Sequence, residues 1–380
     1  MSKIFSTEKV NHLKQPMFFG KPVNIARYDR VKYPWIDKMT DKMNGFHWLP
    51  AIKDLTKDGP DFRSLPEQGK HIFISNLQRQ ILLDTIQGRA ITKAFMPVAS
   101  VPELEPLLVT WEYFETIHSR TYTHIIRNVL PDGSAIFDDI MENEEILKTA
   151  KNLTVYYDEY IEYLEKWQVV ADGFDVELDD EFEFNGEVLT LRKLKELFFM
   201  CLISVNVLEG LRFYSSFLCS WSFAEKDKME GNAGLIKLIS RDENLHTAIT
   251  QKIIRTLRSE DSFFEQLFID KQDEIIKMFE DTVQEEKDWA KYLFQHGSML
   301  GLNEAILGQY IEYMANRRMK ALGMKAIYNQ PQNPVKWSEK WTGSSNIQVA
   351  NQETESSSYV IAGVKSDLAD SNNALNGFEL

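Results

Sequence analysis

The sequence predicts an all-α protein with a four-helix-bundle core, extra helices, a small β-hairpin and a flexible C-terminal tail. Between residues 66 and 323, apolar residues recur at helical spacing over long stretches. One short segment, 182–189, instead alternates apolar and polar residues as a strand does. Residues 344–380 scatter isolated apolar residues among Ser, Asn and acidic ones. Such a segment buries too little surface to offset its ordering entropy, so we expect it to be flexible.

The irregular part comes first along the chain. Five prolines interrupt residues 1–65, where we expect a single helix at Tyr28–Met43. The dipeptide Asn185-Gly186 favours the positive φ angles of a type I′ turn, which predicts a hairpin near 174–190. The helical domain is expected over residues 1–343, and its long helices are predicted at Pro66–Arg89, Pro102–Leu130, Asn143–Trp167, Leu191–Lys226, Gly234–Arg258, Ser262–Gln295 and Asn303–Leu322.

Charge and composition exclude several classes of protein. The 57 acidic residues outnumber the 43 Lys and Arg residues, which argues against a nucleic-acid-binding face. Cys201 and Cys219 are too few for a disulfide framework. The longest apolar stretch, Leu197–Leu208, is short and interrupted by polar residues, so no membrane span or signal peptide is predicted. We expect a cytoplasmic protein that binds neither nucleic acid nor membrane.

Polar residues occupy positions at which the helical pattern predicts buried apolar residues. In Pro102–Leu130 the apolar stripe includes Glu115, His118 and Tyr122 in steps of three and four. Burying a carboxylate and an imidazole costs several kcal/mol unless each finds a partner, about 2–7 for a polar group. The same Glu-x-x-His spacing recurs at Glu243 and His246. Taken alone, each pair also fits a core histidine that is bonded to its neighbouring glutamate.

Two further helices favour a metal site over a simple pair of core histidines. Asp84 follows the apolar stripe of Pro66–Arg89, and Glu209 follows that of the helix from Leu191, so each adds one inward carboxylate. Two lone carboxylates and two Glu-x-x-His pairs are the ligand pattern of dinuclear metal sites in four-helix bundles. Four carboxylates cancel the charge of two divalent cations. Hard oxygen ligands with one imidazole per metal suit iron or manganese.

Tyr122 lies one helical turn beyond His118 on the same face. It could be an ordinary core tyrosine whose hydroxyl bonds to a carboxylate. Its expected surroundings are apolar, since Phe213, Phe217 and Ile239 lie one or two turns from the proposed ligands. We therefore hypothesise that a phenol beside an oxygen-activating metal centre loses one electron and keeps the radical.

Five segments carry a family resemblance. They are QPMFFG at 15–20, LLDTIQGR at 82–89, ETIHSRTYTHIIRN at 115–128, LEGLRFYSSF at 208–217 and MEGNAGLIKLISRDENLH at 229–246. With them the chain resembles the small (β) subunit of class I ribonucleotide reductase, closest to the class Ia form, over nearly its whole length. The resemblance implies a ferritin-like fold and a homodimer.

The resemblance also implies a site. One metal would be bound by Asp84, Glu115 and His118, and the other by Glu209, Glu243 and His246, with Glu115 among the bridging carboxylates. It implies two iron ions per chain (manganese is possible), an oxygen-derived bridging ligand and a tyrosyl radical on Tyr122.

A radical-transfer route is implied in the same way. Asp242 would link Trp48 to His118, and Tyr359 would be the relay residue at the boundary with the large catalytic subunit. The C-terminal peptide Asn376–Leu380 would dock on that subunit. Without the resemblance, these residues would pass for a core aromatic, a solvated helix residue and a tail residue.

The function expected from these features is that of the radical-generating subunit of ribonucleoside-diphosphate reductase, an oxidoreductase. One alternative is a stand-alone di-iron oxidase or desaturase on the same bundle, which would have no use for a tyrosine-bearing tail. Another is a storage or interaction bundle without redox chemistry. No glycine-rich phosphate-binding motif is present, as expected for a chain that does not itself bind a nucleotide substrate.

Overall fold

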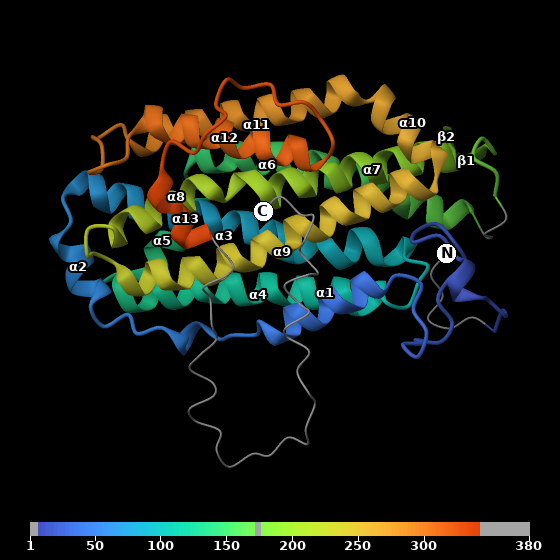
Figure 1. Cartoon of the computed structure of the whole chain (residues 1–380), viewed down its shortest axis with the longest axis horizontal. Coiled ribbons are helices and arrows are strands. Elements are labelled where there is room, and N and C mark those ends of the chain that lie inside the picture. The colour runs from blue at the N-terminus through green and yellow to red at the C-terminus, as the bar shows by residue number, and fades with distance from the viewer. Residues whose placement is uncertain (1–6, 172–175, 343–380) are drawn as a thin grey trace, which may run out of the picture.

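Long helices run roughly along one common axis and form most of the molecule (Figure 1). The computed structural model describes residues 7–171 and 176–342. In chain order the helices and strands are α1 (Pro34–Gly45), α2 (Asp58–Ser64), α3 (Glu67–Phe95), α4 (Leu104–Val129), α5 (Gly133–Ile140), α6 (Glu144–Val170), β1 (Phe182–Phe184), β2 (Glu187–Leu189), α7 (Leu191–Val207), α8 (Tyr214–Ala224), α9 (Glu230–Glu260), α10 (Ser262–Asp270), α11 (Gln272–Leu293), α12 (Glu304–Ala321) and α13 (Glu339–Thr342). The predicted all-α bundle with one hairpin is confirmed.

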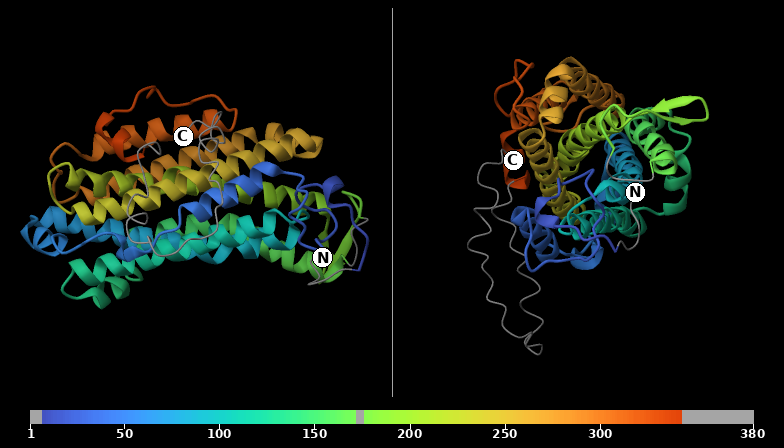
Figure 2. Two further views of the ribbon diagram at one scale, coloured as in Figure 1. Left: turned by 60° about the horizontal axis from the view of Figure 1, so that its bottom comes forward. Right: turned by 90° about the vertical axis from the view of Figure 1, so that its right-hand side faces the viewer.

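Four helical segments form the centre of the bundle. Helix α3 packs along α4, and α7 and α8 pack along α9, while contacts between α3 and α8 and between α4 and α9 join the two pairs. Helices α6, α11 and α12 cover one side of this core, and α1 lies across α4 and α9 (Figure 2). The strands β1 and β2 project from the bundle in the end-on view.

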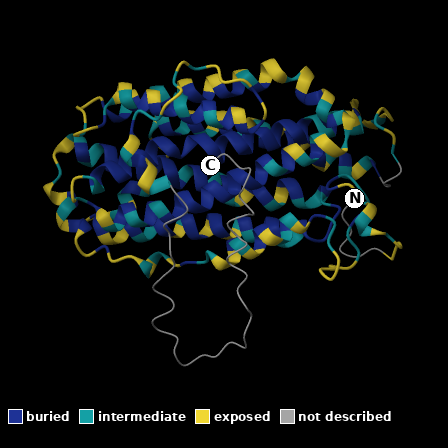
Figure 3. Ribbon diagram, in the orientation of Figure 1, coloured by how far each residue is buried: buried dark blue, intermediate teal, exposed yellow. Residues whose placement is uncertain are grey.

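Burial is greatest in the segment from α7 to α8, where nearly every residue is buried (Figure 3). The run Leu191–Ala224 is long and apolar enough to cross a membrane by composition, which the interrupted pattern of Leu197–Leu208 did not predict. Its apolar window lies entirely inside the protein, so its hydropathy is that of a core helix. The thiols of Cys201 and Cys219 lie in this run, unpaired and fully buried.

Two predicted helices are each divided into two. The helix predicted over Ser262–Gln295 breaks at Lys271, which leaves helical geometry so that α10 packs on α9 while α11 packs on α12. The helix predicted over Leu191–Lys226 contains a π-helical turn, Leu208–Arg212, which separates α7 from α8. Neither break contains the proline that would have marked it in the sequence.

The N-terminal segment holds one helix more than predicted. Helix α1 begins at Pro34 rather than Tyr28, because proline fits the first turn of a helix. The additional helix α2 supplies a cap for α9: the Asp58 carboxylate accepts hydrogen bonds from the backbone N–H groups of Gly231 and Asn232. The short helix α5 was also not predicted.

The hairpin prediction is correct in place and type. Phe182 pairs with Leu189 and Phe184 with Glu187 in antiparallel register. The turn residues Asn185 and Gly186 have φ angles of 52° and 83°, as a type I′ turn requires. The predicted tail, 344–380, lies outside the described residues.

A buried ion pair ties the outer helix α11 to the core. Arg79 on α3 donates hydrogen bonds to both carboxylate oxygens of Glu286 on α11, and Ser215 on α8 donates to the same carboxylate. Both charged side chains are completely buried. The pair links three helices that neighbour the central site.

Candidate metal centre

Six polar side chains meet in the middle of the bundle although they come from four separate segments. All six are completely buried, and they are the residues that the sequence analysis selected: Asp84 on α3, Glu115 and His118 on α4, Glu209 in the π-helical turn, and Glu243 and His246 on α9. The Glu-x-x-His spacing puts both members of each pair on the inner face of its helix.

The six side chains form two overlapping groups. Asp84, Glu115, His118 and Glu243 make one, and Glu115, Glu209, Glu243 and His246 make the other. Within each group the candidate ligand atoms all lie within 4.8 Å of one another. Glu115 and Glu243 belong to both groups, so their carboxylates lie between the two positions. The family resemblance implied a shared position for Glu115 and did not single out Glu243.

Both imidazoles turn the same atom towards the carboxylates. His118 Nδ1 lies 3.1 Å from Glu243 Oε1 and 3.4 Å from Glu115 Oε2. His246 Nδ1 lies 3.0 Å from both Glu115 Oε1 and Glu243 Oε2. Each ring therefore directs its Nδ1 atom at the carboxylates of one group, where a protonated nitrogen donates to them and a deprotonated one could bind a metal ion.

The donor set fits two divalent cations. Both oxygens of Asp84 and one oxygen each of Glu115, Glu209 and Glu243 are buried without a hydrogen-bond partner. Buried anionic oxygens of this kind are costly unless a cation or a proton compensates them. Four carboxylates with two imidazoles give the oxygen-rich ligand set that iron and manganese accept.

Ionisation in this cluster is strongly perturbed. Burial raises the pKa of the Asp84 and Glu209 carboxyls well above their ordinary values. Burial alone would lower the pKa of His118 and His246, but the charges of Glu243 and Glu115 respectively raise it overall. Without metal, protons thus take the place of part of the missing positive charge.

A hydrogen-bonded chain leads from His118 towards Trp48. His118 Nε2 lies 3.3 Å from Asp242 Oδ2, and Trp48 donates its indole N–H to the same oxygen at 2.7 Å. Arg241 Nε donates to the other oxygen, Asp242 Oδ1, at 3.0 Å. Asp242 is buried, so the alternative reading as a solvated helix residue is wrong.

Further polar residues form hydrogen bonds with the proposed ligands or with the residues that contact them. Trp111 donates its indole N–H to Glu115 Oε1 at 2.9 Å, and Gln87 donates to Glu209 Oε1. Tyr157 on α6 donates in turn to Gln87 Oε1 at 2.9 Å. None of these three residues was predicted to take part in the site. Gln87 and Trp111 lie three residues after Asp84 and four before Glu115, so helical spacing from a ligand could have identified them.

Tyr122 is completely buried on α4, and its hydroxyl has no hydrogen-bond partner of standard geometry. Burial, and after it the charge of Asp84, raises the pKa of the phenol well above its ordinary value. The predicted apolar neighbours Phe213, Phe217 and Ile239 are completely buried too. Tyr359 and Asn376–Leu380 lie outside the described residues.

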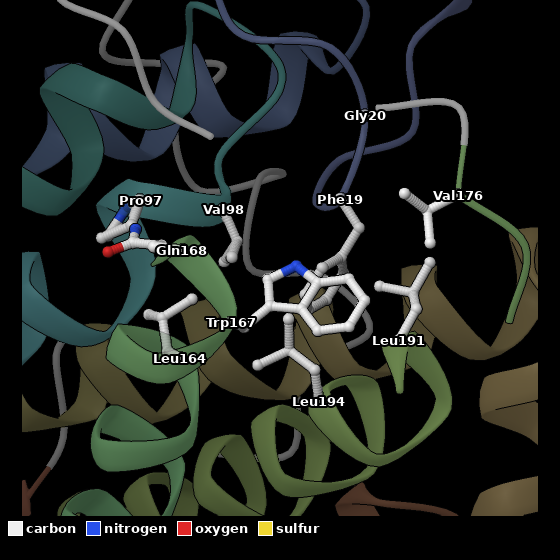
Figure 4. A pocket seen from close by; sticks show the side chains of 10 residues that line it. All are labelled: Phe19, Gly20, Pro97, Val98, Leu164, Trp167, Gln168, Val176, Leu191 and Leu194. Carbon is white, nitrogen blue, oxygen red and sulfur yellow. The ribbon is translucent and has the colours of Figure 1, made fainter. Parts of the chain in front are cut away.

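A cavity at the end of α6 lies apart from this cluster (Figure 4). Its volume is about 60 Å³, and Trp167 lies at its centre among mainly apolar side chains from α6, α7 and the N-terminal segment. Pockets for small-molecule ligands usually measure about 300–1,000 Å³. This cavity is too small for a nucleotide, and no Lys or Arg lines it.

Comparisons with known proteins all point to one family. The family model for the small chain of ribonucleotide reductase matches residues 26–334. The ribonucleoside-diphosphate reductase subunit beta of Buchnera aphidicola is 48% identical, with 99% of each chain covered. The ribonucleoside-diphosphate reductase 1 subunit beta of Escherichia coli O157:H7 is 47% identical, with 96% of each chain covered. A ribonucleotide reductase R2 subunit from Clostridium botulinum shares the fold, with a TM-score of 0.74, 24% identity, and coverage of 90% of this chain and 98% of that one.

Proposed function

The chain belongs to the ribonucleotide reductase small-chain family, and from this premise we propose that its central cluster would hold two metal ions which, with oxygen, would supply the oxidising power needed to form a radical on Tyr122. As a ribonucleoside-diphosphate reductase subunit, it serves the reduction of ribonucleotides to deoxyribonucleotides together with a large catalytic subunit. One observation carries the proposal: six buried ligand-type side chains converge beside a buried phenol whose charge environment is set by Asp84, one of the six.

The proposed metal ions are iron, with manganese as the alternative. Together with oxygen, such a pair supplies the oxidising power that a tyrosine needs to lose one electron. Asp84, Glu115 and His118 would hold one ion, and Glu209, Glu243 and His246 the other. Because Glu115 and Glu243 lie in both groups, either carboxylate would be within reach of both ions.

The residues around Tyr122 would separate the charges and protect the product. When the phenol loses an electron, its proton needs an acceptor, and Asp84 is the carboxylate whose charge acts most strongly on this hydroxyl. The buried side chains of Phe213, Phe217 and Ile239 would exclude water and reductants. A radical formed there would persist because no solvent reaches it.

We further propose that the radical equivalent leaves through Asp242 and Trp48. The shared Asp242 oxygen lies between the imidazole and the indole, which supports coupled movement of a proton and an electron along this line. Tyr359 would continue the route, and Asn376–Leu380 would bind the large subunit. A homodimer and a cytoplasmic location complete the proposal.

Reconstitution tests the proposal. Metal-free protein is loaded with ferrous iron, exposed to oxygen and examined by electron paramagnetic resonance, with Tyr122→Phe as the matched control. We expect bound metal in both proteins and an organic radical only in the wild type. A radical of equal intensity in the Tyr122→Phe variant would contradict the assignment.

Removing residues 345–380 separates the proposal from a stand-alone oxidase. The shortened protein should still form the radical, yet it should lose ribonucleotide reduction with the large subunit. Oxidation of an apolar substrate that survives the truncation would favour the oxidase instead.

A further inference from the structure

The π-helical turn that carries Glu209 is held by a side chain from a distant helix. In such a turn the helical hydrogen-bond ladder is shifted, and π turns occur frequently at functional sites. Here the carbonyl oxygen of Gly210, the residue after Glu209, accepts a hydrogen bond of 3.0 Å from Arg318 Nε. Arg318 lies on α12, outside the four segments that supply the central side chains.

Arg318 is unusual because it is buried without a counter-ion. Only 1% of its surface is exposed, and no carboxylate of residues 7–171 and 176–342 lies within ion-pair distance of its guanidinium. Burial accordingly lowers its pKa. A charge in such a place is costly, so its remaining hydrogen bonds must offset the loss of water.

Two of the three hydrogen-bond partners of Arg318 directly follow proposed ligands in the chain, and the third is Tyr214, at the start of α8. Besides Gly210 O, the guanidinium donates from Nη2 to the Tyr214 hydroxyl at 3.0 Å and to Asn244 Oδ1 at 3.5 Å. The Tyr214 hydroxyl also donates to Asn244 Oδ1, at 2.6 Å. Gly210 follows Glu209, and Asn244 follows Glu243. One guanidinium thus connects the π-helical turn to α9 through the residues that directly follow Glu209 and Glu243.

The fit between Arg318 and the turn depends on the missing side chain of Gly210. A Cβ atom at position 210 would lie 3.0 Å from Arg318 Nε and 3.1 Å from its Cδ. Contacts this short would force the guanidinium away from the carbonyl oxygen. A side chain at position 210 therefore requires Arg318 to shift by a few tenths of an ångström, which would weaken its hydrogen bond to the turn.

We propose that Arg318 is a positioning residue that fixes the π-helical turn and thereby the carboxylates of Glu209 and Glu243. The proposal rests on the proposed function only in taking these two glutamates as metal ligands. The planar guanidinium binds the turn and α9 simultaneously, which a single ammonium group would not do. Its removal should loosen both ligands without touching either of them.

The first test measures metal affinity. Metal-free protein is titrated with Mn²⁺ in a calorimeter, comparing the wild type with Arg318→Met and Arg318→Lys. Residues that hold a ligand from behind typically contribute about 10- to 100-fold to affinity. We expect a loss of this size in both variants. Wild-type affinity in Arg318→Lys would show that charge alone matters and would overturn the proposal.

Arg317→Met is the matched control, because it makes the same substitution at the neighbouring, half-buried position. It should bind Mn²⁺ as the wild type does. If the wild type itself binds no pair of ions, the proposed function fails. If the wild type binds two ions and Arg318→Met binds them equally well, the positioning role fails while the proposed function stands.

The second test needs no metal. Hydrogen exchange of the backbone amides around Gly210 should be faster in metal-free Arg318→Met than in the wild type, while the amides of α6 exchange unchanged. Unchanged exchange around Gly210 would overturn the proposal even if the affinity fell.

A double-mutant comparison tests the contact directly. Gly210→Ala should weaken Mn²⁺ binding because its Cβ displaces Arg318. Adding Gly210→Ala to Arg318→Met should weaken binding little further, since the displaced group is already gone. Fully additive losses would mean that the two residues act separately, and would contradict the proposed role.

Discussion

Trp48 and Asp242 are joined by a 2.7 Å hydrogen bond between two buried side chains that lie 194 residues apart in the chain. Asp242 Oδ2 also faces His118, while Asp242 Oδ1 accepts from Arg241. Each carboxylate oxygen of Asp242 therefore accepts a hydrogen bond from a specific donor. An amide in this place would put its NH₂ group opposite either the Arg241 donor or the Trp48 donor.

Asp242→Asn should consequently interrupt radical transfer without preventing radical formation. We expect the electron paramagnetic resonance signal of Tyr122 to persist, whereas turnover with the large subunit falls. A fall of about 10- to 100-fold is typical when a hydrogen-bond partner of a metal-ligating residue is replaced. Spin quantification and product formation on the same sample check this. Equal losses of radical and turnover would show that Asp242 serves the metal centre instead.

Tyr122→Phe should leave the fold intact. The phenolic hydroxyl is buried and makes no hydrogen bond of standard geometry, so its removal costs at most a weak interaction with Asp84. We expect the free energy of unfolding to stay within about 1 kcal/mol of the wild type, the usual net contribution of one hydrogen bond. Thermal melting of the metal-free proteins measures this. A large drop in melting temperature would reveal a hydrogen bond that the hydroxyl makes.

Metal binding should weaken as the pH falls. Burial raises the pKa of the Asp84 and Glu209 carboxyls, and the neighbouring carboxylates raise the pKa of His118 and His246 against the effect of burial. The metal-free cluster therefore keeps protons that a metal ion must displace, and lower pH stabilises this protonated form. Binding should strengthen from about pH 6 to about pH 8.

Calorimetric titrations in two buffers of different ionisation enthalpy will count the released protons. A binding constant that does not change with pH, together with no proton release, would mean that the cluster is already unprotonated without metal.

Breaking the buried Arg79–Glu286 pair should be strongly destabilising. Arg79→Met leaves the Glu286 carboxylate buried with only Ser215 as a donor. Removing one partner of a buried ion pair typically costs about 3–5 kcal/mol. Urea denaturation of the metal-free protein measures the loss. Lys277→Met, which breaks an exposed pair with Asp281, is the control and should not shift the midpoint; equal shifts would contradict the prediction.

The helices and the central cluster were predictable because both follow from local spacing. In α4 the apolar stripe, Glu115, His118 and Tyr122 share one face, so periodicity alone placed them in the core. The same reasoning found Asp84, Glu243 and His246. The Asn185-Gly186 turn was predictable because its chemistry lies within two residues.

What could not be predicted depends on partners far along the chain. The π-helical turn is held by Arg318, which lies more than a hundred residues later in the chain. The residues Leu208–Arg212 themselves contain no pattern that predicts a π-helical turn. The break at Lys271 follows from the different helices on which α10 and α11 pack. Trp48 and Asp242 meet only through the fold, and the sequence indicated their pairing solely by family resemblance.

The two buried thiols can be used to measure local opening of the core. Burial raises the pKa of Cys201 well above its ordinary value and that of Cys219 to about 12, so hardly any reactive thiolate exists in the folded protein. A thiol reagent can label either side chain only during transient opening of the helix that carries it. The labelling rates therefore measure how often α7 and α8 open on each side of the Glu209 turn. No engineered cysteine is needed for this measurement.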